Sequence, residues 1–79
     1  MNINLSKQAV KFLDSQEDKI VIRVLSAINK LPSGNTKKLK GYDPPIYRLS
    51  VGSFRILYNM ERDNIKVKKI DNRGQAYKN

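Results

Sequence analysis

The stretch Tyr47–Tyr58, with the sequence YRLSVGSFRILY, decides how the rest of the chain folds. Two runs of alternating residues flank the pair Gly52–Ser53, which is the pattern of a β-hairpin with a two-residue turn and glycine at its first position. In this register one face of the hairpin is apolar and aromatic, and three opposed pairs make it: Val51 with Phe54, Leu49 with Ile56, and Tyr47 with Tyr58.

The other face of the hairpin carries two arginines. It opposes Ser50 with Arg55 and Arg48 with Leu57. Arg48 and Arg55 are then diagonal neighbours, roughly 7–8 Å apart at the backbone, and both guanidinium groups can reach one anion. Each planar guanidinium can bind phosphate oxygens with two hydrogen bonds. The pair therefore indicates a phosphate clamp, with the solvated side of a half-buried hairpin as the alternative.

The residues before the hairpin predict a short strand and two helices. Ile3–Leu5 fits a first strand, and Ser6 is a good N-cap for a helix that reaches about Ser15. A second capping signal at Ser15–Asp18 starts a longer helix, which ends at Pro32–Gly34. The apolar residues of this longer helix form one stripe: Ile20, Val21, Val24, Leu25, Ile28 and Leu31.

A third main strand follows the hairpin, from about Ile65 to Asp71. Strict alternation would turn Lys69 toward the core, so a β-bulge or an early exit is expected near Lys68–Lys69. Leu57 and Ile70 are expected on the same open face as the two arginines.

This order of elements predicts an α+β protein. We expect residues 1–79 to form one domain with the order β-α-α-β-β-β, in which a helical hairpin packs on the apolar face of an antiparallel sheet. Residues 35–45 are interpreted as a loop, because Pro44–Pro45 prevents strand pairing before Ile46.

The chain is strongly basic, and the charge is uneven. Sixteen Lys and Arg residues against seven Asp and Glu residues give a net charge of +9. Residues 1–36 hold five basic and three acidic groups, and residues 37–79 hold eleven and four. Such a field attracts polyanions, nucleic acid above all. Four lysines are candidate contacts to an RNA backbone, with solvated surface lysines as the simpler interpretation: Lys37, Lys38, Lys40 and Lys68.

Two missing residue types exclude several kinds of chemistry. The sequence has no cysteine and no histidine, so we expect no disulfide, no thiolate nucleophile, no metal site and no cofactor. The first residues form no apolar signal segment, and no apolar run reaches membrane-spanning length. We expect a soluble cytoplasmic protein.

Near the C-terminus, Arg73 and Tyr77 each have two interpretations. Arg73 either adds a third guanidinium to the clamp or is an ordinary surface charge. Tyr77 either docks the tail on the sheet, or offers a base-stacking ring or a phenol near a reacting oxygen. Asp71 is expected to be a surface acid or an ion-pair partner of Arg55 or Arg73.

Together these residues resemble the RelE/ParE superfamily of toxin–antitoxin systems. The motif is Tyr47-Arg48-Leu49-x-Val51-Gly52-x-Phe54-Arg55-Ile56-x-Tyr58, preceded by Leu39-Lys40-Gly41 and followed by Arg73-Gly74-x-x-Tyr77. The resemblance covers almost the whole chain and implies the RelE-like β-α-α-β-β-β fold. In the RelE branch it implies an mRNA interferase, an endoribonuclease that cuts messenger RNA in the ribosomal A site and so inhibits translation. There the 2′-hydroxyl attacks the adjacent phosphate.

The resemblance also implies roles for four residues. Arg48 matches a basic strand residue near the scissile phosphate. Arg55 matches the phosphate-stabilising arginine, and Arg73 matches the second catalytic arginine. Tyr77 matches the tyrosine that stacks on or orients the cut nucleotide.

Two departures from the family leave the proton acceptor unassigned. Ile46 stands where some members have a lysine, and Asn72 stands where many have a histidine. Tyr77 or one of the loop lysines would have to take the proton from the 2′-hydroxyl.

The partners follow from the same resemblance. It implies a cognate antitoxin protein, with the ribosome and mRNA as targets, and operator DNA bound only indirectly through the antitoxin complex. Two other functions stay open. The ParE branch has the same fold but inhibits DNA gyrase by binding, and a third possibility is a nucleic-acid-binding module without catalytic activity.

Overall fold

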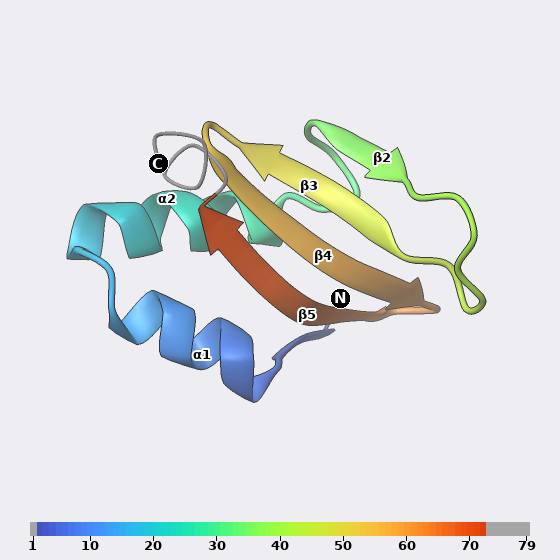
Figure 1. Cartoon of the computed structure of the whole chain (residues 1–79), viewed down its shortest axis with the longest axis horizontal. Coiled ribbons are helices and arrows are strands. Elements are labelled where there is room, and N and C mark those ends of the chain that lie inside the picture. The colour runs from blue at the N-terminus through green and yellow to red at the C-terminus, as the bar shows by residue number, and fades with distance from the viewer. Residues whose placement is uncertain (1, 73–79) are drawn as a thin grey trace.

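Two helices cover one face of a mixed sheet (Figure 1). The computed structural model describes residues 2–72. Within them the elements are, in chain order, β1 (Asn2–Leu5), α1 (Lys7–Asp14), α2 (Asp18–Asn29), β2 (Thr36–Lys38), β3 (Tyr47–Val51), β4 (Phe54–Glu61) and β5 (Asn64–Asn72). The strands lie in the order β1-β5-β4-β3-β2 across the sheet. This arrangement confirms the α+β class.

The β3–β4 hairpin has the predicted register. Gly52 begins its turn with a φ of +58°, which glycine adopts without steric cost. The apolar face points into the core, where the rings of Tyr47 and Tyr58 stack with their centroids 5.5 Å apart. The opposed pairs are Tyr47 with Tyr58, Arg48 with Leu57, Leu49 with Ile56, Ser50 with Arg55, and Val51 with Phe54.

The core lies between this face and the two helices. Helix α1 buries Ala9 and Leu13, and α2 buries Val24 and Ile28. These side chains meet the buried residues of β3, β4 and β5, which are Leu49, Phe54, Ile56, Tyr58, Ile65, Val67 and Ile70. No helix within residues 2–72 has the length and apolarity needed to cross a membrane.

The two helices begin differently. Ser6 caps α1 as predicted, because its hydroxyl accepts the backbone N–H of Ala9 at 3.1 Å. The predicted cap of α2 at Ser15 is wrong. Ser15 closes α1 instead, where its hydroxyl donates to the carbonyl of Phe12 at 2.7 Å, and α2 begins after Glu17 without a side-chain cap.

Two features of the sheet differ from the prediction. The sheet is mixed rather than antiparallel, since β1 pairs parallel with β5. Residues 35–45 are not all loop, since β2 pairs antiparallel with β3. The two prolines lack N–H donors only at their own positions. The chain closes around them through a hydrogen bond from the Leu39 N–H to the Ile46 carbonyl at 2.8 Å, and the residues before it can pair.

The predicted bulge in β5 is confirmed, and it has a consequence for Ile70. Tyr58 pairs with Val67 but Leu57 pairs with Lys69, so Lys68 is the extra residue. A bulge shifts the side-chain alternation by one position. Lys69 therefore points outward and Ile70 is fully buried, so the prediction that Ile70 shares the open face with Leu57 is wrong.

Candidate nucleic-acid interface

The sheet face opposite the helices carries a row of basic side chains. Lys37 on β2 lies opposite Arg48 on β3. Arg48 lies opposite Leu57, which in turn lies opposite Lys69 on β5. Because opposed residues have Cβ atoms about 4.5–5.5 Å apart, Lys37 and Arg48 place two positive charges side by side. Strand β2 thus joins a lysine from the predicted loop to the predicted clamp.

The neighbouring row contains Ser50, Arg55 and Asp71, and it places Arg55 diagonal to Arg48 as predicted. Asp71 pairs with Lys69, with 3.5 Å between Nζ and Oδ2, and not with Arg55. Within residues 2–72 neither Arg48 nor Arg55 has an ion-pair partner. Both positive charges therefore remain uncompensated on this face.

The guanidinium of Arg55 lies against the hairpin turn. Its Nη1 donates to the carbonyl of Gly52 at 2.8 Å and to that of Phe54 at 3.0 Å. A guanidinium has five N–H donors, so Nη2 and Nε can still bind an anion. Since two hydrogen bonds already fix the side chain, less conformational freedom is lost when an anion binds.

Arg48 lacks one hydrogen bond that its burial requires. Its Nε is buried and has no hydrogen-bond partner among the described residues. Leaving a buried donor unpaired costs about 1–3 kcal/mol. A small rotation of the guanidinium would bring Nε to the surface, where a phosphate oxygen would supply the missing acceptor and would also meet the charge of Lys37.

A second guanidinium near the turn belongs to Arg23, which the sequence pattern does not reveal. Arg23 comes from α2, and its Nη2 lies 2.8 Å from the position that a Cβ on Gly52 would take. Only the packing of α2 against β3 brings this arginine to the turn. In the sequence, Arg23 lies outside the apolar stripe of its helix, and nothing distinguishes it there from an ordinary solvent-exposed arginine.

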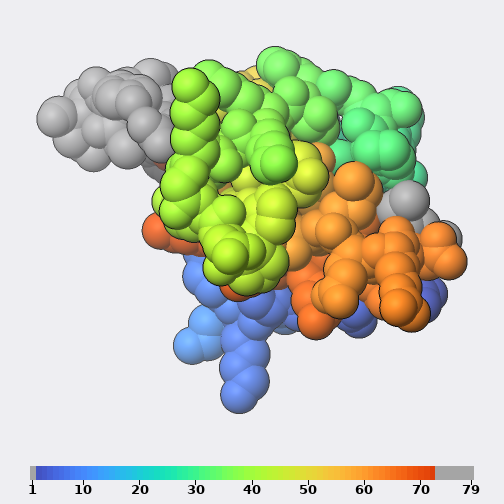
Figure 2. All heavy atoms as spheres, turned by 90° about the vertical axis from the view of Figure 1, so that its right-hand side faces the viewer, coloured from blue at the N-terminus to red at the C-terminus, as the bar shows by residue number. Residues whose placement is uncertain are grey.

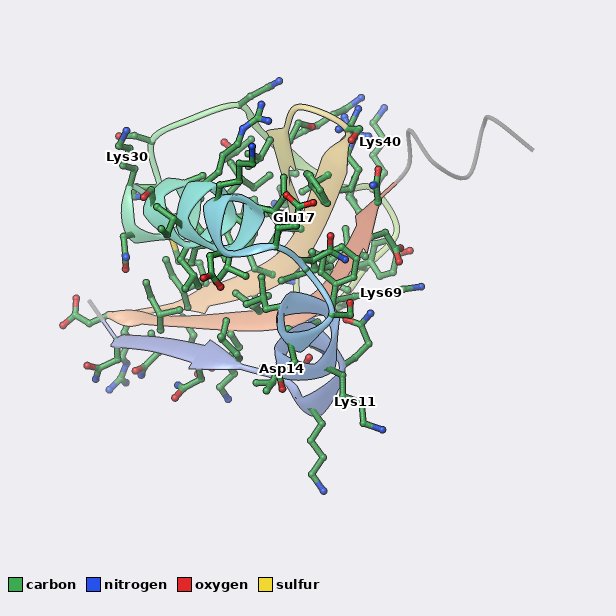
Figure 3. All side chains as sticks on the ribbon, turned by 90° about the vertical axis from the view of Figure 1, so that its left-hand side faces the viewer. Lys11, Asp14, Glu17, Lys30, Lys40 and Lys69 are labelled. Carbon is green, nitrogen blue, oxygen red and sulfur yellow. The ribbon has the colours of Figure 1, made fainter. Side chains whose placement is uncertain are left out.

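The other predicted lysines lie apart from the clamp. Lys38 pairs with Tyr47, whose side chain faces the helices, so Lys38 is not on the open face. Lys40 is exposed and follows the end of β2, so it has no paired position in the sheet, and Figure 3 shows it on the opposite side of the molecule from Lys11. Lys68 is exposed at the bulge. Arg73 and Tyr77 lie outside the described residues.

Tyr58 is not the missing proton acceptor. Burial raises its pKa above the ordinary value of 10.0, a hydrogen bond with Thr36 lowers it, and the nearby Tyr47 raises it. The phenol is therefore neutral at physiological pH and belongs to the core. Within residues 2–72, no group of three His, Cys, Asp or Glu side chains is placed to hold a metal ion.

Known structures with this fold include chains of RelE–RelB complexes. No protein-family model and no curated protein matches the sequence. A chain of the archaeal RelE–RelB complex from Pyrococcus horikoshii matches with a TM-score of 0.74 and 27% identity, over 94% of this chain and 96% of that one. A chain of the RelB–RelE antitoxin–toxin complex from Methanococcus jannaschii matches with a TM-score of 0.73 and 26% identity, over 95% of both chains. A copper-bound mutant toxin from Helicobacter pylori has the same fold, with a TM-score of 0.63 and 18% identity over 95% of this chain and 97% of that one.

Proposed function

We propose that this chain, which belongs to the RelE/ParE superfamily, is the toxin of a type II toxin–antitoxin system. Its similarity to chains of two RelE–RelB complexes supports the toxin role. For the activity of this toxin, we propose a ribosome-dependent endoribonuclease that cleaves mRNA in the A site. The observation that carries it is the buried, unpaired Nε of Arg48, beside Lys37 and diagonal to Arg55.

The substrate class follows from the charges on the open face. Lys37, Arg48 and Arg55 have no acid opposite them in the sheet except Asp71, which pairs with Lys69. A concave or flat surface with this charge binds a polyanion through its phosphates. Single-stranded RNA fits, because a flexible strand can lie across the flat face of a sheet with its bases unstacked.

In the proposed reaction, the 2′-hydroxyl of one nucleotide attacks the adjacent phosphorus. A new bond forms between the 2′-oxygen and phosphorus, and the bond from phosphorus to the 5′-oxygen of the next nucleotide breaks. The products are a 2′,3′-cyclic phosphate and a free 5′-hydroxyl. Arg55 would stabilise the negative charge that grows on the phosphorane, and Arg48 would neutralise the phosphate before attack.

Proton transfer needs a base and an acid. Lys37 lies opposite Arg48, so among the loop lysines it is the best placed to exchange a proton with the reacting oxygens, of which the 2′-hydroxyl loses one proton and the leaving 5′-oxygen gains one. By the family resemblance, Arg73 would be the second catalytic arginine, and Tyr77 would stack on or orient the cut nucleotide. A substrate held in line by the ribosome would compensate for a weak base.

The proposed partner is a cognate antitoxin with an acidic segment. Such a segment would pair with the free cations of the open face and cover the half-buried Leu57. Ile70 contributes nothing to this contact, since it is in the core. Operator DNA would be bound by the antitoxin, and the site of action would be the cytoplasm, where the ribosomes are.

Ribosome profiling after brief expression of the chain tests this proposal. We expect mRNA breaks inside codons at the A site, and relief of toxicity when the product of the adjacent reading frame is co-expressed. Gyrase-type DNA damage without mRNA breaks would instead support the ParE-type function. If neither effect is observed, the remaining interpretation is a nucleic-acid-binding module without catalytic activity.

A further inference from the structure

A hollow lies on the open face, at the end of the sheet away from the hairpin turn. It has a volume of about 480 Å³ and is bounded by Pro44 and Pro45 on one side and by β4 and β5 on the other. Figure 2 shows this end of the molecule, where the loop after β2 (lime) lies beside the end of β4 and the start of β5 (orange). Its volume is within the range of small-ligand sites, about 300–1,000 Å³.

The wall of this hollow is held in place by hydrogen bonds. The side-chain Nδ2 of Asn59 donates to the carbonyl of Pro45 at 2.6 Å. The bond from the Leu39 N–H to the Ile46 carbonyl closes the base of the same loop. The prolines therefore form a fixed apolar surface above the sheet, and a planar ring could enter without rearranging the loop.

The hollow has a carboxylate and an amide on β4. One N–H of the Asn59 amide is used by the bond to Pro45, so its second N–H and its Oδ1 are left for a ligand. Glu61 lines the same hollow, two positions farther along β4 and thus on the same side of the strand. An ionised carboxylate only accepts hydrogen bonds. A ligand that fits here must present N–H groups along one edge.

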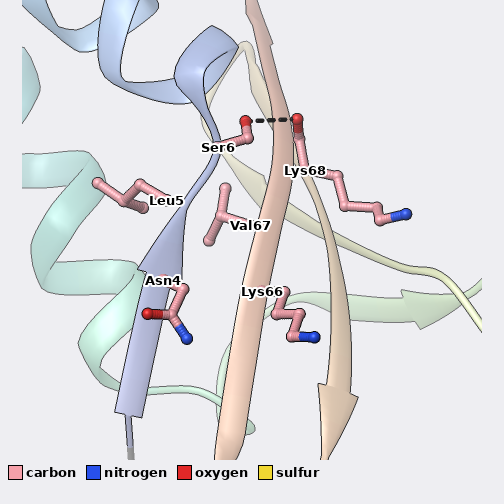
Figure 4. A pocket seen from close by; sticks show the side chains of 6 residues that line it. All are labelled: Asn4, Leu5, Ser6, Lys66, Val67 and Lys68. Carbon is pink, nitrogen blue, oxygen red and sulfur yellow. Dashed lines mark hydrogen bonds between the residues drawn. The ribbon is translucent and has the colours of Figure 1, made fainter.

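The other side of the hollow is basic. Lys66 and Lys68 line it from β5, and both side chains are exposed. Figure 4 shows a neighbouring pocket that the same two lysines line together with Asn4 and Leu5, and in it both lysines extend to the same side of β5. The backbone beneath Lys68 is fixed, since the Ser6 hydroxyl donates to its carbonyl at 2.7 Å. The ligand therefore carries an N–H edge and an anionic group together.

We propose that this hollow is a nucleobase subsite for single-stranded RNA that prefers bases with an amino group, guanine first and uracil last. Guanine presents two adjacent N–H donors that a carboxylate can bind together, and adenine and cytosine present one amino group each. Uracil presents a single N–H between two carbonyl oxygens, and the Glu61 carboxylate would repel those oxygens. Lys66 and Lys68 bind the phosphate of the same nucleotide.

The hollow and the Arg48–Arg55 clamp lie on the same face of the sheet. Arg55, Leu57 and Asn59 alternate along one side of β4, so four residues, or about 13 Å, separate Arg55 from Asn59 at the usual rise per strand residue. A strand of RNA with its phosphate on Arg48 and Arg55 would then place a neighbouring base in the hollow. This inference rests on the proposed function for the identity of the RNA, but the hollow's base preference is measurable without cleavage.

The test is an NMR titration of the purified full chain with each of the four nucleoside 5′-monophosphates. We expect GMP to shift the side-chain amide of Asn59 and the backbone amide of Glu61, and to bind about fivefold more tightly than UMP, the lower end of what a bidentate base contact gives. Glu61→Gln should remove this difference. Glu17→Gln is the matched control, because Glu17 is exposed at the start of α2 and makes no side-chain cap.

Equal binding of GMP and UMP, or shifts confined to the rows of Arg48 and Arg55, would overturn the proposal. The outcome is separable from that of the proposed function. GMP binding in the hollow by a chain that does not cut mRNA would refute the nuclease and support the subsite. Cleavage of mRNA without nucleotide binding in the hollow would refute the subsite alone.

Discussion

The side-chain amide of Gln8 makes both hydrogen bonds of a strand with the backbone of Ile70. Its Nε2 donates to the Ile70 carbonyl at 3.1 Å, and its Oε1 accepts the Ile70 N–H at 3.0 Å. Strand β1 stops pairing with β5 at Leu5, so a residue of α1 continues the ladder where the strand has ended. These bonds fix β5 directly after its bulge, at the point where it leads toward Asp71.

Gln8→Ala should therefore destabilise the fold by about 1–3 kcal/mol, the cost of leaving partly buried backbone groups of β5 unpaired. Urea denaturation measures the change. Lys7→Ala, at the neighbouring exposed position of α1, is the control and should stay within about 0.5 kcal/mol of the unmodified chain. A loss no larger than that of the control would show that Gln8 does not hold β5.

The bulge at Lys68 predicts opposite effects for two similar residues. Ile70→Ala should cost about 2–5 kcal/mol, since it empties part of the core. Leu57→Ala should cost about 1 kcal/mol or less, because Leu57 is only half-buried on the open face. Thermal or urea unfolding of both variants checks this. Equal costs would mean that the alternation of β5 does not change at the bulge.

Much of this sheet could be predicted because its signals are local. The register of β3 and β4 follows from the two-residue turn and from strict alternation of side chains. The bulge follows because strict alternation in β5 would bury the charged side chain of Lys69. The predicted side of Ile70 was wrong because the alternation had not been shifted past the bulge, and a bulge at either Lys68 or Lys69 turns Ile70 into the core. Strand β2 was missed because its three residues, Thr36–Lys38, include two lysines and no apolar pattern, and only pairing with β3 makes them a strand.

Gly52 and Gly41 both have positive φ, of 58° and 85°, but only Gly52 is crowded. Replacing either by alanine should cost about 1–2 kcal/mol from backbone strain alone. A Cβ at Gly52 would also displace the guanidinium of Arg23, whereas nothing lies within 4 Å of a Cβ at Gly41. Gly52→Ala should therefore weaken RNA binding as Arg23→Ala does, and Gly41→Ala should not. Gel-shift titration with single-stranded RNA compares the three variants, and equal binding by all of them would exclude Arg23 from the interface.

The raised pKa of Tyr58 predicts a loss of stability in alkaline solution. The unfolded phenol loses its proton near the ordinary pKa of 10.0, whereas the buried phenol keeps it to higher pH. Stability is thus fully present below pH 10 and falls as pH rises through the window between the two pKa values. Tyr58→Phe should flatten this part of the profile of unfolding free energy against pH. An unchanged slope in the variant would assign the alkaline loss to other groups.

The candidate site was less predictable than the sheet. Arg48 and Arg55 could be paired from the hairpin register alone, which is a local property. Lys37 joins them by pairing with β3, and Arg23 reaches the hairpin turn from α2, which no short-range pattern in the sequence contains. The orientation of the Arg55 guanidinium was also beyond prediction, since it depends on the carbonyls of the turn that it binds.

The most direct test of the central claim is cleavage of mRNA on programmed ribosomes by the unmodified chain and by Arg55→Ala, with the ends of the fragments mapped and their chemistry identified. We predict A-site cuts that leave 5′-hydroxyl ends, a drop of about 10²–10³ in rate for Arg55→Ala, and near-normal cutting by Arg62→Ala, whose arginine lies in the exposed β4–β5 turn. Circular dichroism should show that both variants fold. A folded Arg55→Ala protein that cuts mRNA at the unmodified rate would contradict the assignment of this face as the site of RNA cleavage.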